Sequence, residues 1–527
     1  MKHFWWQTGV IYQVYPRSFQ DTNGDGVGDL KGVISRLDYL QWLGITAVWL
    51  SPIYPSPMKD FGYDISDYEG IHPIFGNIED FDELLAEVHK RGMKLILDFV
   101  PNHTSDQHPW FIESRSSKTN AKRDWYIWCD AAADGGFPNN WLSVFGGPAW
   151  EWDEATKQFY YHAFLKEQPD LNWRNPAVEK AMFDTLRFWL EKGVDGFRVD
   201  VMWHMIKDKN FRDNPVNHEY ESHQATYEQL LPVYSTDQPE VHEVVARMRS
   251  LLDEYNERMM IGEIYLPIHK LVSYYGEDGR GAHLPFNFSL ISLPWNALEI
   301  AAAIDEYEGA LPENGWPNWV IGNHDQPRIT SRVGPSQARI AAMLLLTLRG
   351  TPTIYYGDEI GMRDTPIPFS EVQDPQGLNM PDKNLSRDPA RTPMQWDGEQ
   401  NAGFSDAKPW LRLDRYYERN NVEIQKNDPY SMLTFYRRLI HLRQSEKSLC
   451  EGAYSPVYAD VQAIAFRRKA EGSDSFLIIL NLTHRPFYYK HPVKGTIVLA
   501  TGPELENTKV DGTINLSGDE GIVVREG

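Results

Sequence analysis

The sequence predicts an α/β protein built on an eight-stranded parallel (β/α)8 TIM barrel, with an inserted subdomain after the third strand and a C-terminal antiparallel β domain. Three observations support this fold. Apolar strand-like segments alternate with helix-like segments over roughly 350 residues, the alternation stops once between residues 102 and 172, and after residue 450 it gives way to short alternating stretches. Near-continuous apolar strands that alternate with helices are typical of parallel sheets, and eight such units favour a closed barrel.

The barrel strands are expected in eight segments that are rich in apolar and β-branched residues. They are residues 9–16, 47–54, 94–100, 193–201, 258–265, 283–290, 318–325 and 350–357. Helices are expected between them, clearest at residues 30–44, 77–92, 175–192 and 240–255. In the second helix apolar residues recur at helical spacing, and Asn77 stands where an N-cap is favoured.

These patterns divide the chain into three domains. The barrel takes residues 1–101 and 173–449, and its last helix, at 431–449, is the expected bridge to the next domain. The inserted subdomain takes residues 102–172, which are rich in Trp, Asn, Gly and Asp and show no βα period. The C-terminal β domain takes residues 450–527, where stretches such as AIAFRRK and SFLIILNL read as antiparallel strands.

The composition excludes several classes of partner. The formal net charge is −22, whereas nucleic acids and anionic membranes are bound by clustered Lys and Arg. Two cysteines, far apart in sequence, argue against a disulfide framework. The N-terminus has no apolar stretch of signal length and no run approaches the ~18 apolar residues of a membrane span, so a cytoplasmic protein is expected. The sequence does not indicate an oligomeric state.

Polar residues stand at the ends of four predicted strands, where barrel strands are otherwise apolar. They are Asp98 on the third strand, Arg198 and Asp200 on the fourth, Glu263 on the fifth, and His324 with Asp325 on the seventh. Barrel active sites lie at the carboxyl ends of the strands, so these side chains are expected around one opening. One acid alone would serve equally well as a helix cap or as the partner of an arginine. Together, these residues favour catalysis.

Three carboxylates with an arginine between them suit a reaction that passes through an oxocarbenium-like transition state. One carboxylate attacks or stabilises the cationic carbon, and a second, protonated one donates to the leaving oxygen. Repulsion within a carboxylate cluster raises the pKa of that donor. Glycoside cleavage is therefore the predicted reaction. Metal-assisted hydrolysis is the alternative, although no HxH or HExxH pattern occurs at these positions.

Seven blocks of the sequence resemble the α-amylase family of glycoside hydrolases. Four of them match its signature blocks in order and spacing: DFVPNH (98–103), GFRVDV (196–201), GEIY (262–265) and GNHDQPR (322–328). QPDLNW (168–173) and GTPTIYYGDEIGM (350–362) look like two further blocks. IYQVYPRSFQDTNGDGVGDLKG is similar to the N-terminus of its α-glucosidases and oligo-1,6-glucosidases, so the resemblance covers essentially the whole chain.

The resemblance implies a catalytic role for each of three carboxylates. Asp200 matches the nucleophile, Glu263 the general acid/base, and Asp325 the residue that fixes the 2- and 3-hydroxyls of the sugar. Arg198 would orient Asp200 and hold it ionised. The implied mechanism is a retaining double displacement, in which a glucosyl ester forms on the nucleophile and is then released to water or to a sugar hydroxyl. Asp98 is expected to support the site.

The resemblance also implies a set of residues that bind the first glucose. Tyr63 would stack on the sugar face, and Asp60 would bind the distal 4-hydroxyl. An ion pair between Asp60 and Arg387 would close the pocket behind one terminal glucose, which makes an exo-acting enzyme; Arg391 is the alternative partner. The other expected members are His103, Phe145, Phe164, Val201 and His324, although packing alone would also explain the two phenylalanines.

The residues that follow the implied nucleophile do not decide which α-glucosidic linkage is cleaved. Val201 goes with α-1,6 activity among relatives, but the following MWHMIKD departs from the Asn-containing continuation of oligo-1,6-glucosidases. We therefore expect a general α-glucosidase that acts on short α-linked oligosaccharides, with loop 209–239 over the acceptor side and transglucosylation as a second outcome. Oligo-1,6-glucosidase, a sucrose-acting glucosidase and trehalose synthase, an isomerase, are the alternatives. A non-catalytic relative would have lost the carboxylates that this chain retains.

The segment DTNGDGVGD, residues 21–29, has the oxygen-rich pattern of a divalent-cation loop. An EF-hand needs an acid at its twelfth position, where this chain has Gly32. The resemblance implies instead a static site for one structural divalent cation, Ca²⁺ or Mg²⁺, with no organic cofactor. A merely polar turn is the alternative. The implied ligands are Asp21, Asn23, Asp25, the carbonyl of Val27, and Asp29.

Overall fold

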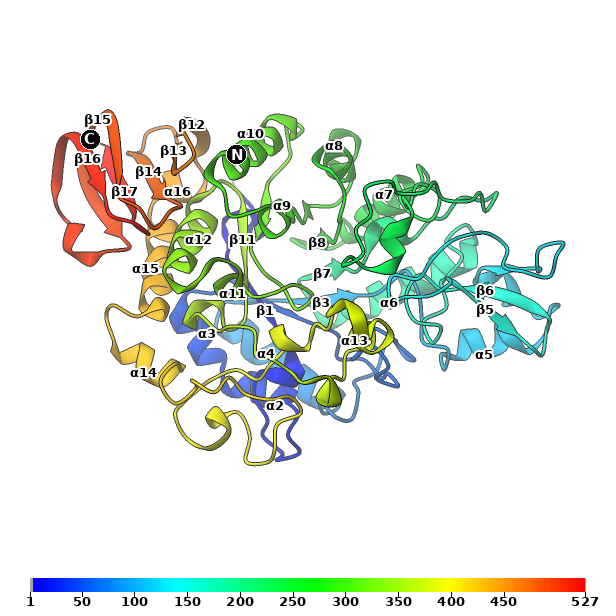
Figure 1. Cartoon of the computed structure of the whole chain (residues 1–527). Helices are drawn as coiled ribbons and strands as arrows, with labels where there is room; N and C mark the ends of the chain where they lie inside the picture. The colour runs from blue at the N-terminus through cyan, green and yellow to red at the C-terminus, as the bar shows by residue number, and fades with distance from the viewer. Residues whose placement is uncertain (1–2, 527) are drawn as a thin grey trace.

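The computed structural model describes residues 3–526, and a parallel eight-stranded barrel forms its centre. The strand order is β10-β11-β1-β2-β3-β7-β8-β9, and a parallel bridge between Asn287 and Trp319 brings the two ends of the sheet together. The predicted fold is therefore confirmed, with one strand in each predicted segment (Figure 1). The barrel strands are β1 (Ile11–Val14), β2 (Ala47–Leu50), β3 (Lys94–Phe99), β7 (Gly196–Val199), β8 (Met259–Gly262), β9 (Leu284–Pro285), β10 (Asn318–Val320) and β11 (Thr351–Tyr355).

The helices follow the expected alternation, with two differences. The segment at 30–44 is two helices, because Arg36 leaves the helical region (φ −107°, ψ 4°) while its guanidinium bonds to Gln20 and stacks on Trp396. The second half of the predicted strand 283–290 is instead a short helix that follows Pro285, whose missing N–H limits sheet pairing. The helices are α1 (Trp5–Thr8), α2 (Leu30–Ser35), α3 (Leu37–Leu43), α4 (Ile78–Lys90), α5 (Pro109–Ser116), α6 (Pro176–Lys192), α7 (Val241–Leu252), α8 (Ile268–Leu271), α9 (Ser289–Ser292), α10 (Ala297–Ala310), α11 (Ile329–Val333), α12 (Pro335–Thr347), α13 (Pro375–Asn379), α14 (Val422–Asn427), α15 (Met432–Ser445) and α16 (Lys447–Cys450).

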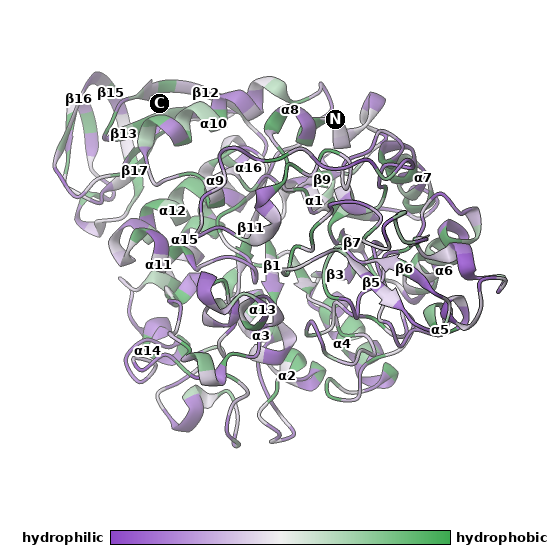
Figure 2. Cartoon of the chain, turned by 45° about the vertical axis from the view of Figure 1, so that its right-hand side comes forward, coloured by the Kyte–Doolittle hydropathy of each residue, from purple (hydrophilic) through white to green (hydrophobic). Residues whose placement is uncertain are grey.

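The barrel strands are buried on both faces. Ile11, Trp49 and Ile261 belong to an apolar cluster that lies inside the barrel, whereas their chain neighbours Tyr12 and Val48 pack into the larger core under the helices. This alternation follows from the two-residue period of a strand. Hydrophobic colour gathers on the central strands and on helices such as α12, and the peripheral loops are largely hydrophilic (Figure 2). The polar exceptions on the strands therefore mark the site.

Two smaller sheets flank the barrel and lie at opposite ends of the molecule in Figure 1. The inserted segment carries the antiparallel strands β4 (Trp128–Cys129), β5 (Trp150–Asp153) and β6 (Gln158–Tyr161). The C-terminal sheet has the order β12-β13-β14-β17-β15-β16 and packs on α10, α12 and α16. Its strands are β12 (Ala453–Ala459), β13 (Ala463–Lys469), β14 (Ser475–Asn481), β15 (Phe487–Ala500), β16 (Lys509–Leu516) and β17 (Gly521–Glu526).

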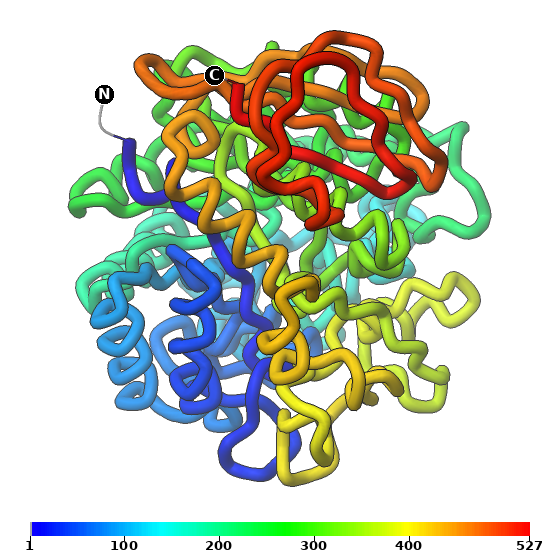
Figure 3. The backbone as a smooth tube through the Cα atoms, turned by 90° about the vertical axis from the view of Figure 1, so that its left-hand side faces the viewer, coloured from blue at the N-terminus to red at the C-terminus, as the bar shows by residue number. Residues whose placement is uncertain are grey.

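The loop after β1 lies beside a segment nearly 400 residues later in the chain. The blue loop that contains residues 21–29 and the yellow segment near residue 405 run together at the bottom of Figure 3. Asp21 joins them, since its N–H donates to the carbonyl of Phe404 and its carboxylate accepts from the hydroxyl of Ser405 at 2.6 Å. The first and last parts of the barrel are thus tied at its rim. No helix among residues 3–526 combines the length and apolar character needed to cross a bilayer.

Candidate active site

A cavity of about 870 Å³ opens at the carboxyl ends of the barrel strands. Connections after several strands line it together with the inserted segment, so it is assembled from parts far apart in sequence. Every residue predicted from the sequence to bind or act on the sugar lines this cavity except Arg198, which lies buried beside it. The lining members of that predicted set are Asp60, Tyr63, His103, Phe145, Phe164, Asp200, Val201, Glu263, His324, Asp325 and Arg387.

Arg198 holds three carboxylates on one guanidinium. Its Nη1 donates to Asp98 Oδ1 at 2.6 Å and to Asp200 Oδ1 at 2.7 Å, and its Nη2 lies 2.7 Å from Glu263 Oε2. All four side chains are buried. Arg198 and Asp200 are two apart on one strand, which places both on the same face of β7. Because Asp200 and Glu263 share the two arms of one guanidinium, their carboxyl groups are close neighbours.

The environment raises the pKa of both Asp200 and Glu263. Burial is the largest cause for each, Arg198 opposes it, and the neighbouring carboxylates add to it. One oxygen of each carboxyl is fixed by Arg198, while Asp200 Oδ2 and Glu263 Oε1 have no hydrogen-bond partner among the described residues. These two free oxygens belong to carboxyl groups that line the cavity. Because the pKa of both groups is raised, one of them tends to keep a proton.

Val201 follows Asp200 in a strained backbone conformation. Its φ of 36° and ψ of 49° are left-handed values, which β-branched residues rarely adopt. In this conformation the Val201 N–H donates to Glu263 Oε2 at 2.8 Å, and the side chain lines the cavity. The strain therefore fixes Glu263 on the neighbouring strand and places an apolar group beside the two carboxyl groups.

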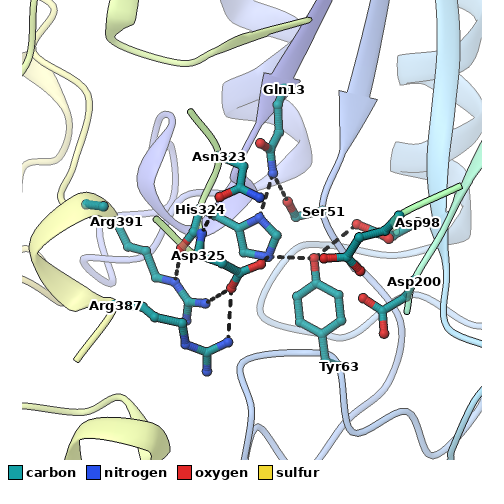
Figure 4. Close-up of polar contacts among 12 residues, drawn as sticks. Gln13, Ser51, Tyr63, Asp98, Asp200, Asn323, His324, Asp325, Arg387 and Arg391 are labelled. Carbon is teal, nitrogen blue, oxygen red and sulfur yellow. Dashed lines mark hydrogen bonds and ion pairs between the residues drawn. The ribbon is translucent and has the colours of Figure 1, made fainter. Parts of the chain in front are cut away.

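His324 lies at the centre of a buried hydrogen-bond network (Figure 4). The amide nitrogen Nε2 of Gln13 is 2.8 Å from His324 Nδ1 and donates to it. The hydrogen of the imidazole ring is therefore on His324 Nε2. His324 Nε2 lies 2.8 Å from the hydroxyl of Tyr63, which donates to Asp98 Oδ2 at 3.1 Å. Burial holds the pKa of His324 well below its ordinary value, so the ring is neutral. Asp98 lies outside the cavity and orients Tyr63 and Arg198 from behind.

Two arginines converge on Asp325 from the loop after β11, as Figure 4 shows. Arg387 Nη1 and Arg391 Nη2 donate to Asp325 Oδ1 at 3.0 and 2.9 Å. Burial alone would raise the pKa of Asp325, but the guanidiniums of Arg387 and Arg391 hold it below the ordinary range. Arg387 Nη2 also donates to Asp60 Oδ1 at 2.7 Å, so Arg387 rather than Arg391 is the partner of Asp60.

The wall from the inserted segment is aromatic. Phe164 packs against Phe145 and His103 with ring centroids 5.5 and 5.3 Å apart. Phe145 lies under Arg387, whose guanidinium carbon is 4.8 Å from the ring centroid. Burial lowers the pKa of His103 to about 4, and Tyr63 O and Asn102 Nδ2 lie within 3.1 Å of its two ring nitrogens. His103 is therefore a neutral wall of the cavity whose polar atoms already have protein partners.

Some residues of the site carried no signal in the sequence. Asp374 accepts from Nε and Nη2 of Arg387 at 3.0 and 2.7 Å, and nothing in its loop marks it as part of the site. Trp203, Tyr227 and Glu228 also line the cavity. The last two come from loop 209–239, which was expected there as a whole. A βα period does not specify which residues of a long loop face inward.

The predicted cation loop has the donor chemistry of a hard-cation site, without a carboxylate cluster. Asp21 Oδ1 accepts from the N–H groups of Asn23 and Gly24, and Asp25 Oδ1 accepts from Val27. Asp29 caps α2 through Gly32. Among residues 3–526 no group of three or more His, Cys, Asp or Glu side chains is placed to hold a metal. The oxygen-only donors fit Ca²⁺ or Mg²⁺, and the loop's own N–H groups orient them.

A family model described as "Alpha amylase, catalytic domain" matches residues 13–452. The chain is 40% identical over 505 residues to a "Probable alpha-glucosidase" of Rhizobium meliloti, with 93% of this chain and 91% of that protein covered. It is 39% identical over 531 residues to the "Oligo-1,6-glucosidase" of Parageobacillus thermoglucosidasius, with 93% of each chain covered. Among solved structures, an isomaltulose synthase mutant from Erwinia rhapontici NX5, in complex with its natural substrate sucrose, has a TM-score of 0.90, 36% identity and 99% coverage of both chains.

Proposed function

The chain belongs to the α-amylase family of glycoside hydrolases, and on that premise we propose that it is a retaining, exo-acting α-glucosidase. It releases α-glucose from the non-reducing ends of short α-glucosides of the maltose and isomaltose type. The α-glucosidase and oligo-1,6-glucosidase relatives, which align over nearly their whole length, support a hydrolase on small α-linked substrates.

The observation that carries the exo-acting part of the proposal is the ion pair between Asp60 and Arg387. Both side chains line the cavity that contains Asp200 and Glu263, and the pair is 9% exposed at most. A buried pair of this kind closes the cavity at one side and offers charged hydrogen-bonding groups to one terminal sugar. A longer glucan would have to break it to pass through, at a cost of several kcal/mol.

The geometry supports a double displacement on the two carboxyl groups that share Arg198. Arg198 stabilises the ionised form of Asp200, whose free oxygen attacks the anomeric carbon while the proton on Glu263 passes to the leaving oxygen. Asp325, kept ionised by two arginines, accepts hydrogen bonds from the sugar hydroxyls. Glu263 then takes a proton from water, or from a sugar hydroxyl in transglucosylation, and the glucosyl ester is cleaved with overall retention.

A sucrose-acting or isomerising enzyme is the second candidate. It is favoured by the likeness to an isomaltulose synthase whose natural substrate is sucrose, at a TM-score of 0.90. Both candidates use the same glucosyl ester and differ in the leaving group and in what accepts the glucosyl unit. The acceptor half of the cavity, bounded by Val201 and loop 209–239, decides between them.

A time course on maltose, isomaltose, sucrose and trehalose, with the product anomer followed by NMR, tests the proposal. We expect α-glucose as the first anomer from maltose or isomaltose, with mutarotation following. An initial β-glucose signal would contradict the retaining mechanism. Conversion of sucrose to an isomer without release of glucose would favour the second candidate, and conversion of maltose to trehalose would identify a trehalose synthase.

We further propose that one Ca²⁺ or Mg²⁺ binds the loop at 21–29 through Asp21, Asn23, Asp25, the carbonyl of Val27, and Asp29. The ion would stabilise a rim loop and take no part in the chemistry. The oxygen-only donor set, whose side chains are oriented by N–H groups of the loop itself, supports the proposal. A cytoplasmic location stays a prediction, which fractionation of the source cells tests.

A further inference from the structure

Asp374 is a buried carboxylate that binds Arg387 and does not line the cavity. Its side chain is 0% exposed, and it is absent from the cavity wall. Oδ1 accepts from Arg387 Nε at 3.0 Å and from Nη2 at 2.7 Å, and Oδ2 accepts from the backbone N–H of Arg387 at 2.8 Å. The same carboxylate thus holds both the head and the backbone of this arginine.

Arg387 has all three of its guanidinium nitrogens committed to carboxylates. Nε bonds to Asp374 alone, Nη2 is shared between Asp374 and Asp60, and Nη1 bonds to Asp325. Phe145 covers one face of the plane. A planar guanidinium has a fixed fork geometry, so the anchor at Nε determines where the other two arms point. Asp374 therefore decides how Nη2 meets Asp60.

Asp374 is itself held by its own loop. The carboxylate of Asp388 accepts from the backbone N–H groups of Gln373 and Asp374 at 2.7 and 3.1 Å, just before α13 begins. Burial alone would raise the pKa of Asp374, but Arg387 and Arg391 hold it below its ordinary value. The anchor is therefore rigid and charged.

We propose that Asp374 is a positioning residue that sets the guanidinium of Arg387 against Asp60 and so fixes recognition of the 4-hydroxyl of the terminal glucose. This inference rests on the proposed exo-acting glucosidase. Asp60 needs the anchor because its Oδ1 depends on Arg387, while its Oδ2 accepts only from Gln168 Nε2 at 3.1 Å. Without Asp374, Arg387 regains rotamer freedom and turns towards Asp325, which leaves Asp60 without its charged partner.

The test is Asp374→Asn, measured with two inhibitors. Both oxygens of Asp374 accept from N–H donors, so whichever way the amide turns, its NH2 group faces an N–H of Arg387. We measure kcat/KM for maltose and the inhibition constants of glucose and of 4-deoxyglucose. We expect kcat/KM to fall about 10–100-fold and glucose to bind about tenfold more weakly, whereas 4-deoxyglucose weakens less than about twofold. The preference for the 4-hydroxyl is then lost.

Glu371→Gln is the matched control in the same loop. Glu371 also pairs with a guanidinium, that of Arg412, but it does so at the surface and does not line the cavity that contains Arg387. We expect both kcat/KM and the ratio of the two inhibition constants to stay within about twofold of the parent protein. If Asp374→Asn does not fold, Asp374→Glu replaces it, because this variant keeps two acceptor oxygens but places them one methylene further out. It should reduce the ratio of the inhibition constant of 4-deoxyglucose to that of glucose.

Two outcomes separate the hypotheses. A normal ratio of the two inhibition constants in Asp374→Asn, or in Asp374→Glu if that variant is used, would overturn the positioning role. If both inhibitors also bind more weakly by the same factor, the variant has damaged the loop in general. If the parent protein neither hydrolyses α-glucosides nor binds glucose, the proposed function itself fails, and that result is visible before any variant is made.

Discussion

Replacing Arg198 with Lys should slow the enzyme and move its pH profile. The guanidinium makes three contacts of 2.6–2.7 Å to three carboxylates from two nitrogens, and a single ammonium nitrogen cannot span both arms of that fork. At least one charge-assisted bond is lost, at about 1.5–3 kcal/mol. If the loss falls on Asp200, kcat/KM drops about 10–150-fold, and the pKa of this carboxyl rises by about 1–2 units.

The assay is kcat/KM on an α-glucoside between pH 4 and 8. If Asp200 is the nucleophile, a raised pKa of its carboxyl means that activity is lost earlier as the pH falls, so the acid limb should move upward by about 1–2 units. Arg443→Lys is the control: Arg443 is equally buried and its three contacts go to the carbonyls of residues 346, 348 and 350, away from the site. It should lower Tm and leave the profile in place. An unmoved acid limb with near-normal kcat/KM in Arg198→Lys would refute the reasoning.

Three further predictions follow from the site and its surroundings. Asp200→Asn should reduce turnover by about 10³-fold or more with Tm nearly unchanged; wild-type-like kinetics would remove Asp200 from the role of nucleophile. Treatment with EDTA should lower Tm by a few °C, because an ion present at about 100 Kd contributes ~2.7 kcal/mol, while kcat stays the same at temperatures where the protein is folded; readdition of Ca²⁺ should restore Tm, and no change in Tm would mean a merely polar loop. His162 is buried in the inserted segment with its pKa lowered to about 4 by burial, below the unfolded value of about 6.5, so its contribution to stability is present above pH 6.5 and lost as the pH falls towards 4. The free energy of unfolding should fall by about 2 kcal/mol between pH 7 and 5 because of this group. In denaturant titrations, the free energy of unfolding of His162→Gln should therefore fall less steeply over this range. Equal declines in the two proteins would mean that His162 is already protonated in the folded protein.

Sequence reasoning found the barrel because its signals are local. Each barrel strand is an apolar run whose period is set by burial on both faces, and each side chain proposed to be catalytic stands at the end of such a run, as Asp200 does after β7 and Glu263 after β8. The breaks in that pattern were less visible. Arg36 interrupts a helical period because of partners at Gln20 and Trp396, and the second of these is 360 residues away in sequence.

The loops were the part that local patterns could not resolve. Asp374 resembles any surface aspartate in a segment rich in Pro, Gln and Asp, and its role depends on an arginine 13 residues later and on burial that only the folded loop creates. The same holds for Tyr227 and Glu228. The partner of Asp60, by contrast, could be narrowed to two arginines in advance, and geometry selected Arg387.

The pairing of β1 with β11 has a consequence for synthesis of the chain. Ile11 stands opposite Thr353, and Asp325 receives its two arginines only from residues 387 and 391, so neither sheet closure nor the charged site exists until most of the chain has been made. At 5–20 residues per second, the roughly 340 residues between the two strands take about 20–70 s. Throughout that interval the free edge of β1 is open to pairing with other nascent chains. Translation speed and chaperone supply, more than final stability, should therefore set the yield of active enzyme in a foreign host.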